Sequence, residues 1–181
     1  MIKNKVVVAW NKNEKVVALS EIISAIAMLE DPGQVSFYPS VFVLVTNLLD
    51  WFGDLVYDRL RDNAADKKKN PKGLPGNFTT KDVNDETREI CRNWFFKVSS
   101  ITEIVPRLYV ELALLKCNQF IMTSVTYSSI LARIGTAIRG IADPLLASYC
   151  RTYLVVCAQK VIIDITAIFI FMEVIYIYIS R

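Results

Sequence analysis

One short segment of the chain combines side chains that are well suited to binding another protein. Pro106, Arg107, Leu108 and Tyr109 follow one another within an apolar helical pattern. The Arg107 guanidinium carries five donors in a planar fork that fits carboxylates or backbone carbonyls, and Tyr109 offers rigid apolar area with a polar tip. Ser100 and Glu103 match a capping box, which would place Pro106 one to two turns inside a kinked helix. We therefore interpret this segment as a contact site rather than a catalytic one.

The remaining reactive side chains do not form a recognisable catalytic or metal site. The chain contains no histidine, so Ser-His-Asp and Cys-His arrangements and His-bearing metal sites are excluded. Asp50, Asp54 and Asp58 form a helical acidic row, which is typical of a solvated face, and no nucleophile or phosphate-binding loop accompanies them. We expect no enzyme activity, no cofactor and no metal.

Four cysteines, none of them in a CxxC pair, lie in apolar helical patterns: Cys91, Cys117, Cys150 and Cys157. This placement predicts buried reduced thiols in a cytosolic protein and argues against structural zinc. The apolar run from Val6 to Trp10 is too short for a secretory signal.

Size and charge narrow the class of partner. The 181 residues suit one ordinary domain or a piece of something longer, and the mean hydropathy of +0.33 is high for a soluble domain. A net charge of +3 gives no electrostatic footprint for nucleic acid. Four lysines between positions 67 and 72 lie in a Pro/Gly-containing stretch, which we interpret as a solvated linker.

Apolar residues recur with helical periodicity through most of the chain, and the helices that they predict would position the residues discussed above. Asn13 is the predicted cap of a first helix whose apolar face comprises Val16, Val17, Ile22, Ile23, Ile26 and Leu29. Further helices are predicted from Pro39 to Arg61, from Asp85, through Pro106 to Phe120, from Ser128 to Gly140, and from Asp143-Pro144. Short connections predict an all-α chain of antiparallel pairs, and periodicity does not distinguish a bundle from an α-solenoid.

Composition divides the chain into four parts. Residues 1–62 form an N-terminal helical pair, 63–84 a flexible loop rich in Lys, Pro and Gly, and 85–159 the helices that carry the Pro-Arg-Leu-Tyr motif. Residues 160–181 form an apolar tail that differs from the rest.

Six sequence blocks, occurring in order, carry a resemblance to a known family: Phe37–Ser40, Asp50–Tyr57, Cys91–Lys97, Val105–Glu111, Ile138–Leu145 and Tyr149–Leu154. They resemble the N-terminal region of the vacuolar protein sorting 35-like family, the large subunits of the retriever complex. A more distant similarity is to the retromer counterpart, which shares the Pro-Arg-Leu-Tyr motif. The resemblance covers about residues 36–158 apart from the lysine loop and is expected to end near Gln159.

The resemblance implies a truncated, HEAT-like α-solenoid that scaffolds a cargo-recycling coat, cytoplasmic and peripheral on endosomes, in endosome-to-plasma-membrane transport. It implies an arrestin-like subunit at the N-terminal end, and a metallophosphoesterase-like subunit that binds only the full-length protein. By the motif, Pro106, Arg107, Leu108 and Tyr109 would contact the arrestin-like subunit. The alternative from the residues themselves is that Leu108 and Tyr109 are inter-helix core, with Arg107 bound to a carbonyl freed by the proline.

The tail allows a different function. Residues 161–179 are apolar on every face and nearly long enough to span a bilayer. Asp164 and Glu173 oppose insertion, because an acidic residue near a membrane helix centre costs about 2.5 to 3.5 kcal/mol, and an aggregation-prone strand is another option. We expect a truncated product whose last residues come from a different reading of the gene. The alternatives are a membrane protein with a C-terminal tail anchor and a non-functional truncated product.

Overall fold

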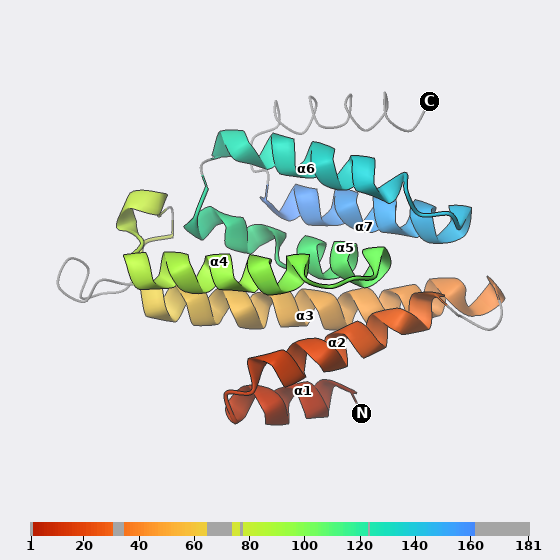
Figure 1. Ribbon diagram of the computed structural model, residues 1–181, viewed down its shortest axis with the longest axis horizontal. Helices are drawn as coiled ribbons and strands as arrows, with labels where there is room; N and C mark the ends of the chain where they lie inside the picture. Colours follow the sequence, from red (N-terminus) through yellow and green to blue (C-terminus); the bar gives the residue numbers. More distant parts are fainter. Residues whose placement is uncertain (1, 31–34, 65–73, 77, 123, 162–181) are drawn as a thin grey trace.

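The computed structural model describes residues 2–30, 35–64, 74–76, 78–122 and 124–161. Seven α-helices lie in this part of the chain: α1 (Ile2–Asn11), α2 (Lys15–Glu30), α3 (Tyr38–Ala64), α4 (Asp85–Ser99), α5 (Ile104–Ala113), α6 (Ser124–Ile138) and α7 (Pro144–Val161). Three short 3-10 segments accompany them: η1 (Val35–Phe37), η2 (Thr80–Asp82) and η3 (Leu115–Phe120). Helices stack side by side from α1 to α6 and α7 (Figure 1), which confirms the predicted all-α, solenoid-like fold.

The N-terminal part contains three helices rather than the predicted pair. α1 was not predicted because its apolar run is short, but Val6 is fully buried and the Trp10 ring stacks on that of Trp94 at 6.1 Å. Asn13 lies in the turn between α1 and α2 with a left-handed φ of 65°, a conformation that asparagine tolerates, so it does not cap α2. The predicted apolar face of α2 is also narrower than expected, because Val16 is 63% exposed and Val17 is 48% exposed.

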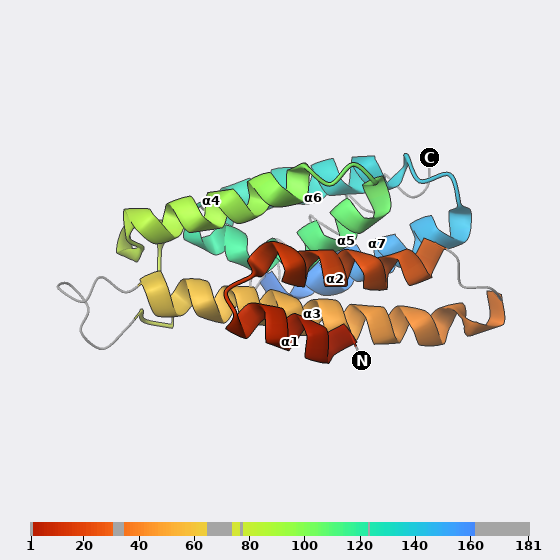
Figure 2. The same ribbon diagram turned by 60° about the horizontal axis from the view of Figure 1, so that its bottom comes forward.

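α2 occupies a central place in the lower half of the molecule. It packs against α1, α3 and α5. The turned view shows it running between α3 and the region where α4 passes into α5 (Figure 2). Its residues Ile22, Ile26 and Leu29 are buried, which accounts for the helical periodicity of this segment.

Part of the predicted flexible loop over 63–84 is packed against the core. Residues 65–73 and 77 lie outside the described residues, but Leu74, Phe78 and Val83 are buried. The Phe78 ring contacts that of Phe120 at 5.0 Å. The Asn84 side-chain oxygen accepts a hydrogen bond of 2.7 Å from the backbone N–H of Thr87, which caps α4 at its predicted start.

The last two helices begin and end close to the predicted signals, with one exception. α6 begins at Ser124, four residues before the predicted cap Ser128, and Gly140 follows its C-terminal end. The Asp143 carboxylate accepts a hydrogen bond of 2.9 Å from the backbone N–H of Leu146, so Asp143 caps α7 and Pro144 is its first residue.

One described segment, Val35–Ala64, is long and apolar enough to cross a membrane by length and composition alone. Its residues Leu49, Phe52 and Val56 are fully buried in the protein core, which accounts for part of that apolar character. The tail-anchor prediction for 161–179 concerns residues that, from 162 onward, lie outside the described part of the chain.

Candidate partner-docking site

The motif lies at the start of α5, and its proline does not kink the helix. Glu103 occupies the N-cap position with an extended backbone, so Pro106 is the third helical residue. The first N–H groups of any helix lack an intrahelical acceptor, so the missing donor of a proline costs nothing here. Normal helical bonding resumes at Arg107, whose backbone N–H donates to the Glu103 carbonyl at 3.3 Å.

The predicted capping box between Ser100 and Glu103 is therefore wrong. Ser100 belongs to the end of the preceding helix, where its hydroxyl donates to the Lys97 carbonyl at 2.7 Å. The sequence pattern was right about a helix start in this region but placed it one turn too early. Because α5 starts at Ile104, the proline marks the start of the helix and not a bend within it.

Three of the four motif residues belong to the protein core. Pro106 is buried, Leu108 is 1% exposed and Tyr109 is fully buried. The Tyr109 ring stacks on the Tyr153 ring of α7, with centroids 5.6 Å apart and planes 19° apart. These side chains hold α5 against its neighbours, as the core interpretation of Leu108 and Tyr109 states, and in this conformation they offer a partner almost no surface.

The Tyr109 hydroxyl lies in an apolar setting that keeps it neutral. Burial is the main cause that raises its pKa well above the ordinary value, and the nearby Cys150 and Tyr38 add to the shift. Burial likewise raises the pKa of Tyr38 to about 12, with Asp143 as a second cause. Neither hydroxyl has a partner with good hydrogen-bond geometry among the described residues.

Arg107 is the motif residue that reaches the surface. Its side chain is half-buried, and within the described part of the chain it makes no hydrogen bond or ion pair, so the carbonyl contact expected from the core interpretation is not formed there. Glu111, one turn along the same helix, is already bound to Arg133 of α6. Within the described residues the Arg107 guanidinium therefore forms no ion pair, and its donors are available to a carboxylate of a partner.

Within the acidic row, Asp50 has a structural role. The Asp50 carboxylate accepts hydrogen bonds from the Tyr153 hydroxyl at 3.0 Å and from Lys160 Nζ at 2.6 Å, which ties α3 to α7. Asp54 and Asp58 are exposed, as expected of a solvated face.

The four thiols are buried and unpaired, which confirms the predicted placement. Burial raises the pKa of the thiols to about 12 for Cys91, Cys150 and Cys157, and well above the ordinary value for Cys117. No cluster of Cys, Asp or Glu among the described residues could hold a metal ion.

Comparison with known proteins identifies the family of the chain. The sequence model of a family described as VPS35L matches residues 1–177. The chain belongs to the VPS35L family. A Danio rerio relative called "VPS35 endosomal protein-sorting factor-like" is 51% identical over 146 residues, which is 81% of this chain and 15% of the relative. The Homo sapiens protein of the same name is 44% identical over 146 residues, with the same coverage of both chains.

A distant member shows the same pattern. The Dictyostelium discoideum "VPS35 endosomal protein sorting factor-like" is 41% identical over 150 residues, 81% of this chain and 14% of the relative. The chain thus spans about 15% of the length of the curated relatives it matches. The family match is wider than the predicted range of 36–158, because it includes α1 and α2 and extends to residue 177, beyond the point where we expected the resemblance to end.

Proposed function

We propose that this chain forms the docking end of a retriever-type complex for endosome-to-plasma-membrane recycling, where it binds an arrestin-like subunit. Membership of the VPS35L family and the name of the relatives, endosomal protein-sorting factor-like, support a role in endosomal protein sorting. On this proposal the protein is cytoplasmic and peripheral on endosomes, acts as a scaffold rather than an enzyme, and binds a metallophosphoesterase-like subunit only as part of a full-length chain.

The half-buried Arg107 guanidinium, which forms no ion pair with the described residues, is the observation that carries the proposal. Pro106, Leu108 and Tyr109 are buried and fix the position of α5, so they act through the helix they shape. Arg107 would then contact the partner directly through a carboxylate or a row of backbone carbonyls, which its planar fork can bind with two parallel hydrogen bonds. The motif thus divides into three residues that position the helix and one that touches the partner.

Binding of the purified arrestin-like subunit to the 181-residue chain tests this division. Arg107→Ala should weaken binding by about 2 to 5 kcal/mol, because it leaves the partner's acceptor buried and unpaired. That loss is a factor of roughly 30 or more in Kd, which calorimetry or a pull-down resolves. The affinity of Arg107→Lys should lie between those of the parent and of Arg107→Ala, because the lysine ammonium keeps the charge but cannot form the bidentate contact.

Two control variants separate contact from positioning. Arg92→Ala removes an exposed arginine of α4 that is paired with Glu89, and should bind as well as the parent. Tyr109→Phe removes a buried hydroxyl that no partner can reach, and should also bind normally. Parent-like binding by Arg107→Ala would show that the interface lies elsewhere.

A further inference from the structure

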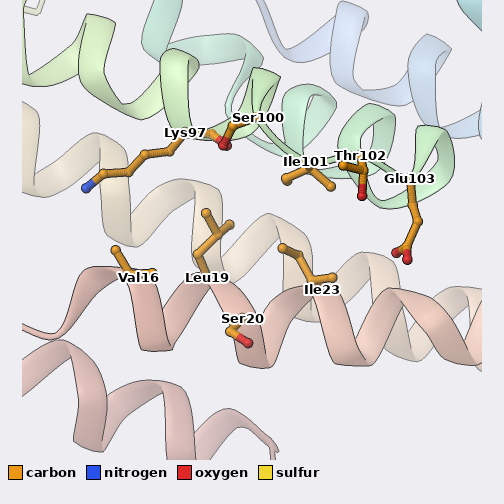
Figure 3. Close-up of a pocket in the computed structure, with 9 residues that line it drawn as sticks. All are labelled: Val16, Leu19, Ser20, Ile23, Lys97, Ser100, Ile101, Thr102 and Glu103. Atoms are coloured by element: carbon orange, nitrogen blue, oxygen red, sulfur yellow. The ribbon is translucent and has the colours of Figure 1, made fainter.

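A hollow of about 370 Å³ lies between α2 and the turn that joins α4 to α5. Leu19 and Ile23 of α2 face Ile101 of the turn and form an apolar floor (Figure 3). Val16, at one end of the hollow, is 63% exposed although it is β-branched and apolar. The volume is near the lower end of ligand pockets, which span roughly 300–1,000 Å³, so the hollow suits a few apolar side chains.

The two ends of the hollow carry opposite charges. Lys97 lies at the end near Val16, and Glu103 lies at the other end, past Ile23 (Figure 3). Glu30 lies near Glu103 but does not line the hollow, and burial together with the charge of Glu103 raises the pKa of its carboxyl. Among the described residues none of these three groups has a partner of opposite charge.

We propose that this hollow binds an extended apolar segment of a partner protein that carries an acidic residue at one end and a basic residue at the other. The apolar middle of such a segment would cover the floor formed by Leu19, Ile23 and Ile101. Its acidic residue would pair with Lys97, and its basic residue would pair with Glu103. Opposed end charges of this kind fix the direction in which a segment lies and exclude segments with the wrong pattern.

Polar groups along the rim fit a polypeptide better than a small apolar molecule. Ser20 and Thr102 are exposed and line the hollow between its two charged ends. Their hydroxyl groups can donate to or accept from the backbone of an extended segment. Arg107 does not line the hollow, so a segment bound there would make a contact separate from the proposed docking of the arrestin-like subunit.

Three short fluorescent peptides test the charge pattern by polarisation with the 181-residue chain. All share a Leu/Ile/Ser middle, and their end residues are Glu with Arg, Glu with Glu, or Arg with Arg. The mixed peptide should bind about threefold to tenfold more tightly than the others, because it gains one more exposed ion pair than either and avoids one like-charge contact. Equal affinities for the three peptides, or no binding by any of them, would refute the proposal.

A charge reversal makes the test independent of peptide chemistry. In Lys97→Glu both ends of the hollow are acidic, so the peptide with two Arg ends should become the tightest binder. Lys116→Glu is the matched control, because Lys116 is also exposed and also lies over an aromatic ring, that of Tyr57 at 4.0 Å, but is outside the hollow. An unchanged order of affinities in Lys97→Glu, or the same reordering in Lys116→Glu, would overturn the proposal.

Discussion

Gly53 of α3 lies directly against the backbone of α5, and this close contact predicts the effect of Gly53→Ala. A Cβ atom built on Gly53 would lie 2.2 Å from the carbonyl oxygen of Ala113 and 3.1 Å from its carbonyl carbon. Both are backbone atoms, so no side chain can rotate away, and the two helices would have to move apart. Overpacking of a core costs about 1–3 kcal/mol, and a backbone obstacle favours the upper part of that range.

The helix itself offsets part of this cost. Alanine is more favourable than glycine inside a helix by about 1 kcal/mol. We therefore expect Gly53→Ala to lower the free energy of unfolding by about 2 kcal/mol, the difference between the two terms. The matched variant is Gly135→Ala in α6, where the nearest heavy atom is Leu154 Cδ2 at 4.0 Å, an ordinary contact. This substitution should raise the free energy of unfolding by about 0.5–1 kcal/mol.

Urea unfolding followed by circular dichroism measures both variants under the same conditions. The midpoints should shift in opposite directions with an unchanged slope, because neither change alters the surface exposed on unfolding. If Gly53→Ala were as stable as the parent, α3 and α5 would not be in the tight contact that the structure shows. If both variants were stabilised alike, helix propensity alone would govern these positions and the packing argument would fail.

Three other predictions concern the core and its pH dependence. Tyr109→Phe should leave the free energy of unfolding unchanged or raise it, because the lost hydroxyl makes no hydrogen bond of good geometry among the described residues. Tyr153→Phe should lower the free energy of unfolding by about 1.5–3 kcal/mol, because it removes a hydrogen bond to Asp50. Asp143→Ala should cost about 1 kcal/mol in thermal unfolding, since it removes the cap of α7, and Asp143→Asn should largely restore it. The folded state raises thiol pKa values from 9.0 to about 12, so stability is fully present below pH 9 and is lost between pH 9 and 12. Cys91, Cys150 and Cys157 together should lower the free energy of unfolding by about 4 kcal/mol at pH 10 relative to pH 8, as measured by urea unfolding. Replacing the three residues by alanine should reduce this difference between the two pH values.

Local signals were enough to predict most helices because each of those helices carries its own start. Asp143-Pro144 marks α7, and Asn84 with Asp85 marks α4, through contacts within one turn of the chain. α1 carries no such signal. Its place is set by Trp10, which lies against Trp94 and Phe52, residues that are far away in sequence. A contact of that kind depends on the finished fold, so periodicity within α1 could not reveal it.

The prediction of a flexible loop from 63 to 84, made from composition, was partly wrong for a related reason. Its lysines, prolines and glycines suggest a solvated loop, but three scattered apolar residues, Leu74, Phe78 and Val83, are enough to hold its second half on the core. The Phe78 ring finds Phe120, which lies in the 3-10 segment after α5. The charged hollow beside α2 was also missed, because Lys97 and Glu103 are brought opposite α2 only by the turn between α4 and α5.

The Pro-Arg-Leu-Tyr motif shows why a recognised sequence pattern does not by itself define a contact surface. Position three of a helix tolerates proline without loss, so Pro106 needs no functional explanation. Leu108 and Tyr109 are buried, and stacking on Tyr153 accounts for the aromatic ring. Of the four motif residues, the arginine alone makes no hydrogen bond or ion pair with the part of the chain that the structure describes and is not fully buried. Since Arg133 already neutralises Glu111, the cation on this face of α5 is matched by nothing in the described part of the chain, and a partner that supplies a carboxylate would complete it.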